Sequence, residues 1–394
     1  MLARSTTVLP TRLPPSVYLI AMGAFALGMA SYVTAGLIPL IAPAFAVSLA
    51  LAAQLVTAFT LAYGLGSPLA VALLPAHRQR AALLLSLGVF VAANGASAMA
   101  ADFASLMALR AIAGMASGVY LALGIAASAG VSAPGQQGKA ISVIMGGMAG
   151  GTVLGVPLSL LLAQQLGWAW AMWLVALLGT LALAGLCWKL PALPAAPPVP
   201  LRRKLALLGD GQVLAILLVS LLAAIASLGM YTFIAPLLAP GGEAVAPFLW
   251  AWGVGGVAGS MLVGPLADRM AAPRLTQAIV LLLACSLAAL ALAGALRPVL
   301  HHYLALLPIV LWGAAGWALQ VPQNQRLLAV RAAQGDGNLA IALNESALYL
   351  GSAIGAAAGG LLLLLDWPAW MLAASAALTA SAAALLQRWK LRRA

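Results

Sequence analysis

Apolar residues run along this chain in stretches of helix length, and short polar segments divide them. A helix needs about 20 mostly apolar residues to cross the hydrocarbon core of a bilayer. Twelve stretches meet that length, so the pattern predicts twelve membrane-spanning helices and no soluble domain. The predicted spans are 17–40, 50–74, 81–100, 103–128, 140–165, 168–189, 211–238, 245–267, 275–296, 302–330, 338–364 and 367–388.

One polar interruption is much longer than the others. Residues 191–210 contain five prolines, followed by the basic run Arg202, Arg203 and Lys204. Repeated prolines favour an extended chain over a helix. We interpret 191–210 as a linker on the cytoplasmic side. It divides the chain into an N-terminal bundle of six spans, within 1–190, and a C-terminal bundle of six spans, within 211–394.

The composition agrees with a membrane protein. Charged residues are 7% of the chain and apolar residues 64%, whereas soluble proteins carry about 25% charged residues. Lipid must therefore solvate most of the surface, and we expect a monomer in the bilayer. The net charge of +12 indicates no nucleic-acid partner, because the basic residues are spread over short loops instead of forming a surface interleaved with aromatics.

The basic residues fall on one side of the predicted membrane. With an even number of spans both termini share a side, and 17 of the 19 Lys and Arg residues lie there. Arg297 falls on the other side, and Arg110 falls inside a span. Basic loops mark the cytoplasmic face, so we expect a multi-pass protein of the bacterial inner membrane with both termini cytoplasmic. The 17 residues are Arg4, Arg12, Arg78, Arg80, Lys139, Lys189, Arg202, Arg203, Lys204, Arg269, Arg274, Arg326, Arg331, Arg388, Lys390, Arg392 and Arg393.

The two halves repeat one another. Spans 2 and 8 end in similar sequence motifs, at 66–70 and 264–269, and a short basic loop follows each of them. Internal symmetry of this kind indicates a transporter with a cavity between two bundles. Glycine rows let helices approach closely, and Pro157 adds a bend, so we assign these residues to packing and rocking. The rows lie in spans 5 and 11, at Gly147, Gly151 and Gly155 and at Gly351, Gly355 and Gly359.

Three segments resemble motifs of the major facilitator superfamily. Gly264–Arg269, followed by Arg274, resembles the loop motif between two helices. Leu106–Gly118, which contains Arg110, resembles the fourth-helix motif, and Gly146–Pro157 resembles the fifth-helix antiporter motif. The resemblance implies the major facilitator fold, an all-α membrane protein with twelve transmembrane helices in two pseudo-symmetric six-helix bundles.

Two further segments, at 35–39 and 54–58, are similar to the drug:proton antiporter-1 branch, which includes arabinose and chloramphenicol efflux permeases. This resemblance implies export. The chain also departs from the family. Residues 71–75 replace the loop aspartate of the first half, and Ala30–Val33 stand where many relatives carry acidic residues in helix 1.

Two ionisable residues inside predicted spans are candidates for proton coupling. Arg110 lies about two turns into span 4, where a charge costs about 3 kcal/mol unless it is paired or hydrated. Its side chain either faces a cavity, or it extends to the membrane interface or donates hydrogen bonds to backbone carbonyl groups. Glu345 is the acidic residue within a span. Burial favours the neutral form of a carboxyl group, as proton exchange requires. The alternative places Glu345 at the cytoplasmic interface, near a helix N-terminus.

A cytoplasmic gate is predicted where Gly264 precedes Asp268 and Arg269 at a helix end. In this hypothesis Asp268 pairs with a helix N-terminus or a basic residue of the other half and holds one state of the transporter. The alternative is a solvated surface pair, which contributes little to stability.

Aromatic and amide side chains in the spans are candidates for a substrate cavity, because tyrosine and tryptophan combine an apolar face with one hydrogen-bonding group. Each serves equally well as a packing residue or an interface anchor. We expect no enzymatic activity, cofactor or metal site, since no nucleophile has a base and His301 and His302 have no third ligand. Cys187 and Cys285 are expected to be buried thiols. The cavity candidates are Tyr32, Tyr120, Tyr231, Trp312, Trp317, Asn344 and Tyr349.

Together these features favour a secondary active transporter. We expect it to export a small amphipathic molecule (a drug, a sugar derivative or a metabolite such as a siderophore) in exchange for protons, by alternating access. A proton-coupled uptake symporter has the same fold and stays open. A membrane enzyme or lipid-handling protein is a third interpretation, against which the lack of clustered catalytic side chains argues.

Overall fold

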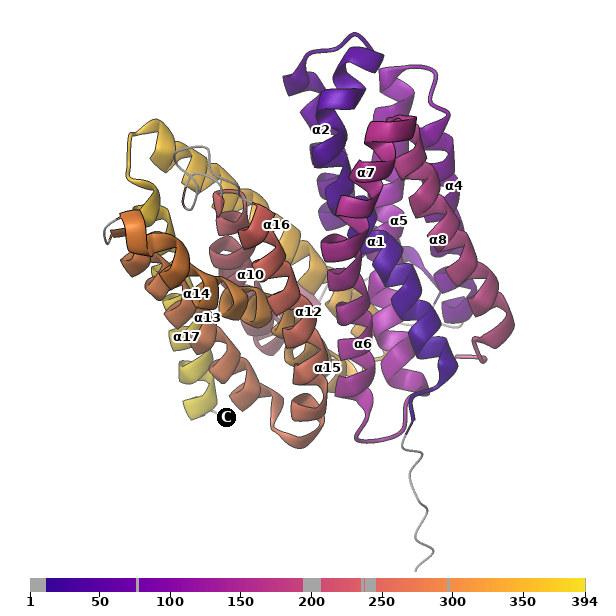
Figure 1. Cartoon of the computed structure of the whole chain (residues 1–394). Helices are drawn as coiled ribbons and strands as arrows, with labels where there is room; N and C mark the ends of the chain where they lie inside the picture. Colours follow the sequence, from indigo (N-terminus) through magenta and orange to yellow (C-terminus); the bar gives the residue numbers. More distant parts are fainter. Residues whose placement is uncertain are drawn as a thin grey trace, which may run out of the picture.

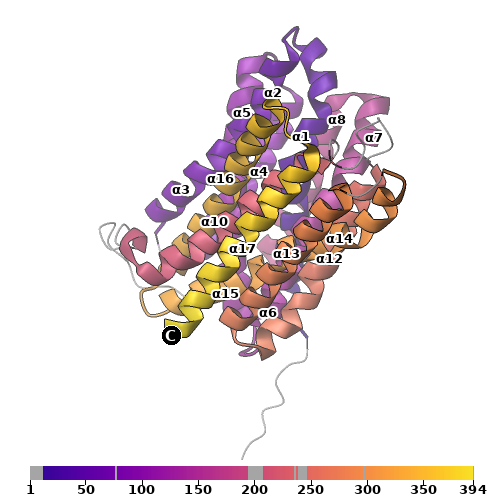
Figure 2. The ribbon, with the colours of Figure 1, turned by 90° about the vertical axis from the view of Figure 1, so that its left-hand side faces the viewer.

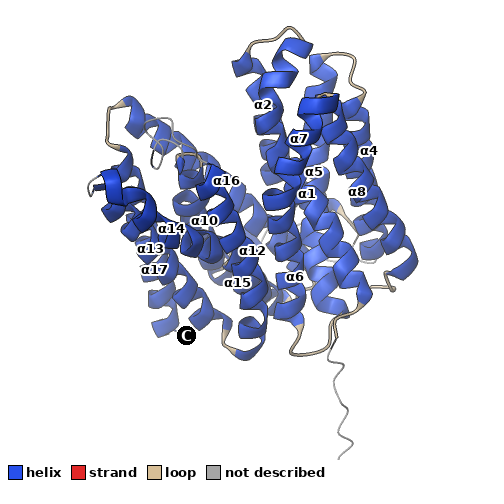
Figure 3. Ribbon diagram, in the orientation of Figure 1, coloured by secondary structure: helices blue, strands red, loops and turns tan. Residues whose placement is uncertain are grey.

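The structure, a computed structural model, describes residues 12–75, 78–193, 207–234, 237, 246–295 and 298–393. These residues form helices, with no strand among them (Figure 3). Within this part of the chain, twelve helical segments are long and apolar enough to cross a membrane. The predicted all-α architecture of twelve spans is confirmed.

The N-terminal bundle holds the first six spans, at nearly the predicted positions. Short π-helices divide the second and fifth spans. The elements are α1 (Pro15–Ala44), α2 (Leu49–Leu61), η1 (Ala62–Gly66), α3 (Ser67–Leu73), α4 (Gln79–Ala98), α5 (Phe103–Val131), α6 (Gln137–Gly150), η3 (Gly151–Gly155), α7 (Val156–Leu166) and α8 (Trp168–Lys189).

The C-terminal bundle holds the other six spans. Most of the predicted linker, 194–206, lies outside the described residues. Helix α10 ends before the predicted position 238, because Thr232 and Phe233 form a turn. The elements are the 3-10 turn η4 (Leu207–Gly209), α10 (Gly211–Tyr231), α12 (Ala246–Arg269), α13 (Ala272–Ala295), α14 (Pro298–Ala318), α15 (Gln320–Arg331), α16 (Gly337–Leu364) and α17 (Ala369–Arg393).

The spans alternate in direction, so the described basic loop residues gather at one end of the molecule, here called the basic end. Arg80 at the start of α4 bonds the carbonyl of Leu190 after α8. Arg331 at the end of α15 bonds Asp210 before α10. Helix α1 begins at this end and α17 finishes there (Figure 1). The twelve-span pattern therefore gathers these residues as the sequence predicted.

Prolines explain the two π-helices. Pro68 follows η1 and Pro157 follows η3. A proline has no N–H to donate to the carbonyl four residues earlier. One wider turn before the proline accommodates the missing donor and bends the span. Spans 2 and 5, which both contribute to the contact between the bundles, are therefore not straight rods.

The glycine rows bring helix backbones into direct contact within each bundle. A Cβ atom at Gly151 would collide with the carbonyl oxygen of Phe25 in α1, and one at Gly355 would collide with that of Ile225 in α10. Small residues are what such close approach requires. The α1 surface also meets Gly147 and Gly155, the α10 surface meets Gly351, and Phe233 in the turn after α10 meets Gly359.

The two bundles meet along two seams. One joins α6 to α12, and the other joins α5, η1 and α3 to α16. Figure 1 shows the bundles close together at the basic end and diverging toward the opposite end. Figure 2 looks onto the C-terminal bundle and shows α16 beside α3.

Cys187 and Cys285 are exposed on the outside of the bundles. The expectation that both thiols are buried is wrong. In a membrane span, hydropathy does not separate the face that meets lipid from the face that meets protein, because both are apolar.

We expect Gly355→Ala to destabilise the protein, because its Cβ meets backbone atoms of α10 that cannot rotate away. Overpacking of this kind costs about 1–3 kcal/mol. Gly360→Ala is the matched control in the same helix, where an added Cβ meets nothing within 4 Å. Thermal unfolding of the purified protein measures both. Equal melting temperatures for the two variants would contradict the packing argument.

Candidate functional site

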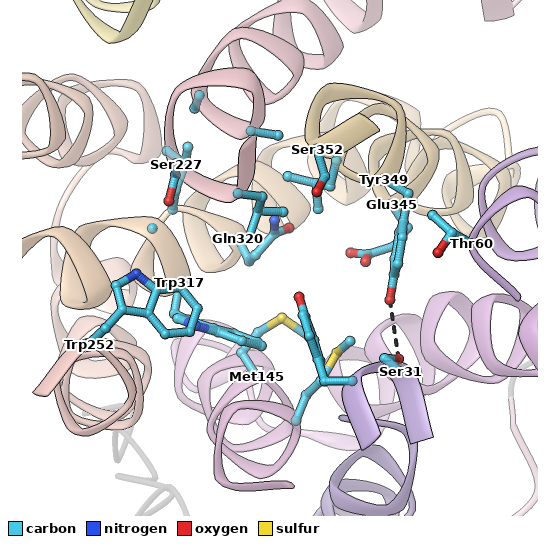
Figure 4. Close-up of a pocket in the computed structure, with 18 of the residues that line it drawn as sticks. Ser31, Thr60, Met145, Ser227, Trp252, Trp317, Gln320, Glu345, Tyr349 and Ser352 are labelled. Atoms are coloured by element: carbon cyan, nitrogen blue, oxygen red, sulfur yellow. Dashed lines mark hydrogen bonds between the residues drawn. The ribbon is translucent and has the colours of Figure 1, made fainter. Parts of the chain in front are cut away.

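A cavity of about 190 Å³ lies between the two bundles (Figure 4). A cavity of about 150 Å³ accommodates benzene, so this one has room for a small aromatic molecule. Among the predicted residues, Tyr32, Trp317, Tyr349 and Glu345 line it. Sequence reasoning missed other lining residues, chiefly Ser31, Thr60, Met145, Met148, Ser227, Trp252, Gln320 and Ser352.

Glu345 is buried, with 3% of its surface exposed. The first helical residue of α16 is Gly337, which puts Glu345 more than two turns inside the helix. Tyr63 of the N-terminal bundle donates a hydrogen bond to Glu345 Oε2 at 3.4 Å. The ring of Tyr63 packs at a tilt of 35° against that of Tyr349, with centroids 3.9 Å apart. Both bundles therefore contribute to the surroundings of this carboxyl group.

A buried cluster of amides lies on α15 and α16 beside Glu345. Asn344 Nδ2 donates to Asn324 Oδ1 at 2.9 Å and to Gln320 Oε1 at 3.3 Å. Gln323 Nε2 donates to Ser220 and to the carbonyl of Ile216 in α10. Asn344 thus belongs to this cluster and not to the cavity lining. The cluster supplies polar groups inside the C-terminal bundle, where burial without partners is costly.

Arg110 is buried in the N-terminal bundle, with 1% of its surface exposed. Its Nη2 donates to the carbonyl of Ala30 at 2.8 Å, and its Nη1 donates to Asn94 Oδ1 at 3.2 Å. The guanidinium also lies over the Phe59 ring, 4.6 Å from its centroid. The sequence left open whether Arg110 faces a cavity or bonds carbonyl groups, and in the structure it bonds a carbonyl group. Arg110 joins α1, α4 and α5 and does not line the cavity.

Three other predicted cavity residues lie behind the lining. The Tyr120 hydroxyl donates to the carbonyl of Ile20, inside the N-terminal bundle. Trp312 Nε1 donates to Ser227 Oγ at 2.9 Å. Tyr231 packs against Trp252, with ring centroids 4.4 Å apart. Packing, the alternative interpretation of these side chains, describes their positions.

Asp268, near the end of α12, caps the N-terminus of helix α6 in the other bundle. Its Oδ1 accepts a hydrogen bond from the backbone N–H of Gly138 at 2.6 Å, and its Oδ2 accepts one from Lys139 at 2.9 Å. Both donors are in the first turn of α6, whose dipole favours a negative charge. Gly264, one turn earlier, leaves room for Ser142 and Lys139 of α6. Arg269 is exposed.

At the second seam, the described residues of the N-terminal bundle supply no equivalent carboxylate. Val71 takes the position in the repeat that Asp268 has in the other half, and it lines a small space together with Asn338 of α16. Asp336, just before α16, is bonded by Arg331 at 2.7 and 2.8 Å, within its own bundle. Val71 therefore brings no charge to the N-terminus of α16.

Arg331 also ties the start of α10 into this region. It bonds Asp210 at 3.0 Å, and Asp210 caps α10 through the backbone N–H groups of Gln212 and Val213. Burial alone raises the pKa of Asp210. The backbone hydrogen bonds and the charge of Arg331 outweigh burial and hold that pKa below its ordinary value.

A twelve-helix membrane protein with a cavity between two pseudo-symmetric bundles has the architecture of a membrane transporter. Residues 20–337 match the family model of the Major Facilitator Superfamily, and the chain belongs to that family of transporters. The resemblance seen in the sequence motifs is confirmed.

Bacterial relatives cover most of the chain. The inner membrane transport protein YdhP of Escherichia coli (strain K12) is 33% identical over 345 residues, which are 86% of this chain and 87% of YdhP. A chloramphenicol resistance protein of Streptomyces lividans is 33% identical over 352 residues, 87% of this chain and 88% of the relative. These relatives support a multi-pass protein of the inner membrane.

Solved structures share the fold. The proton:xylose symporter XylE has a TM-score of 0.77 at 16% identity, over 95% of both chains. FucP in an outward conformation has a TM-score of 0.77 at 13% identity, over 95% of this chain and 98% of FucP.

We expect Arg110→Lys to lower the melting temperature, because an ammonium group cannot reach Ala30 and Asn94 while also covering Phe59. Hydrogen bonds to charged groups contribute about 1.5–3 kcal/mol each. Arg388→Lys, at an exposed position of α17, is the control. The structural role assigned to Arg110 fails if both variants melt at the wild-type temperature.

We expect Asp268→Asn to open the basic end more often, since the amide carries no charge for the N-terminus of α6. A cysteine at Ser142, which packs against Gly264, reports this opening through its rate of maleimide labelling after Cys187 and Cys285 are replaced by serine. Asp102→Asn is the control, because Asp102 caps α5 within one bundle. Labelling should accelerate with Asp268→Asn and stay unchanged with Asp102→Asn. Equal rates would show that Asp268 does not hold the bundles together.

Proposed function

We propose that this protein exports a small amphipathic molecule in exchange for protons. The observation that carries the proposal is the cavity between the bundles, in which Glu345 is a buried carboxyl group that both bundles surround. A carboxyl group in an apolar interior exchanges its proton with few competing charges nearby. Export agrees with the similarity to the chloramphenicol resistance protein of Streptomyces lividans, a relative at 33% identity.

Alternating access follows from the two seams. If the basic end faces the cytoplasm, as the positive-inside rule predicts, the bundles are closed toward the cytoplasm here and diverge toward the outside. In this outward-facing state Glu345 takes up a proton as substrate leaves. Opening the basic end then requires Asp268 to release the N-terminus of α6, after which Glu345 loses its proton to the cytoplasm and substrate binds.

Gly264, Asp268 and Arg269 form the gate in this scheme, and the glycine rows keep each bundle rigid while it rocks. Arg110 acts indirectly. By bonding the carbonyl of Ala30, it holds the turn of α1 that presents Ser31 and Tyr32 to the cavity. Its part in proton coupling is therefore to position a cavity wall, whereas Glu345 carries the proton.

The substrate is a drug, a sugar derivative or an exported metabolite such as a siderophore. The described cavity favours the smaller of these. Uptake by proton symport uses the same cavity, and the direction of proton movement relative to substrate separates the two.

Everted membrane vesicles test the coupling. After respiration has established a pH gradient, adding a transported compound from a panel that includes chloramphenicol should release protons from the lumen, seen as recovery of acridine orange fluorescence. We expect Glu345→Gln to abolish this recovery. Asp366→Asn, an exposed acid outside the spans, should retain it. Full recovery with Glu345→Gln would falsify the proton site, and substrate-induced acidification of the lumen in the absence of respiration would indicate that protons move together with the substrate.

A further inference from the structure

The described residues that line the cavity include an acidic side chain and no basic one. Glu345 is the single carboxyl group among the described residues that line it, and no lysine, arginine or histidine joins it there. The two buried arginines among the described residues lie outside the lining: Arg110 bonds Ala30 and Asn94, and Arg331 is paired with Asp210 and Asp336. An anionic ligand would therefore lose its hydration without gaining a positive partner, which is costly in a membrane interior.

Aromatic rings form one wall of the cavity. Tyr32 and Trp252 line it, and Tyr231 lies between them with ring centroids 6.3 and 4.4 Å away. Trp317 continues the wall, 6.2 Å from Trp252. Figure 4 shows Trp252 and Trp317 on the side of the cavity opposite Glu345. The faces of such rings carry negative potential and attract organic cations.

Two hydroxyl groups that line the cavity already donate their hydrogen bonds to backbone carbonyl groups of their own helices. Ser31 Oγ donates to the carbonyl of Leu27, and Thr60 Oγ1 donates to that of Val56. Thr60 Oγ1 keeps lone pairs that accept hydrogen bonds, and Ser31 Oγ keeps one beside its 3.4 Å contact with the Tyr349 hydroxyl. Both hydroxyls therefore present acceptors, which match the N–H groups of an ammonium ion.

We infer that the cavity selects organic cations, namely molecules with an apolar or aromatic body and a protonated amine. The inference rests on the proposed function in one respect, that this cavity is the substrate site. The amine lies toward Glu345 and the hydroxyl acceptors, and the body packs on the tryptophan wall and on the two methionines of α6, whose soft side chains adapt to different shapes.

Three probes that share one aromatic body test the charge preference. They are 2-(1-naphthyl)ethylamine, 1-naphthaleneethanol and 1-naphthaleneacetate, which at neutral pH are a cation, a neutral molecule and an anion. Each is titrated into the purified protein in nanodiscs, and the melting temperature is recorded. We expect the amine to raise the melting temperature most, the alcohol less, and the acetate not at all.

Variants identify the groups responsible. Glu345→Gln should weaken binding of the amine by about tenfold or more and leave the alcohol nearly unchanged. Trp317→Leu should weaken the amine more than the alcohol, because it removes the attraction between the cation and the ring. Trp170→Leu, on the exposed face of α8, should change neither.

The outcomes separate this inference from the proposed function. Stabilisation by the acetate or the alcohol equal to that by the amine overturns the charge preference, as does the absence of any shift with the amine. If the amine binds as expected but moves no protons in everted vesicles, the cation site stands and proton-coupled export fails. Loss of amine binding with Trp170→Leu would place the site elsewhere and overturn the assignment to this cavity.

Discussion

The carboxylate of Asp268 on the first turn of α6 is a charged contact between the two bundles at the basic end, and the proposed cycle depends on it. The N–H groups of a helix start have no partner within their own helix, and here the opposite bundle supplies one that is charged. This contact joins the two bundles at the basic end, and in the proposed function it is the gate. The cavity lies between the two bundles, which are close together at the basic end and diverge toward the opposite end.

The bundles have similar architecture and different chemistry. The C-terminal bundle contributes Glu345, the amide cluster and most of the aromatic wall. The N-terminal bundle uses its buried charge, Arg110, to join three of its own helices. The carboxyl group that a ligand in the cavity meets therefore comes from the C-terminal bundle.

Local signals in the sequence were sufficient for the spans, because lipid imposes a length that apolar stretches reveal directly. The glycine rows were also visible, since their spacing places them on one helix face. The cavity lining was only partly predictable. Helices that are apolar all round carry no pattern that separates inward faces from lipid-facing ones, which is why Tyr120 and Trp312 were proposed and Met145 and Ser227 were missed. The burial of Glu345 depends on where α16 begins, and hydropathy leaves such a boundary uncertain by several residues.

Val71 gives the seam between α3 and α16 a different mechanical character from the seam that Asp268 closes. Apolar side chains can slide past one another without breaking a charged hydrogen bond, so in the proposed export cycle we expect this edge to act as the pivot. Opening of the basic end in that cycle separates α6 from α12. The two bundles would then rotate about one side, and a molecule that enters from the basic end would pass between α6 and α12, near Asp268.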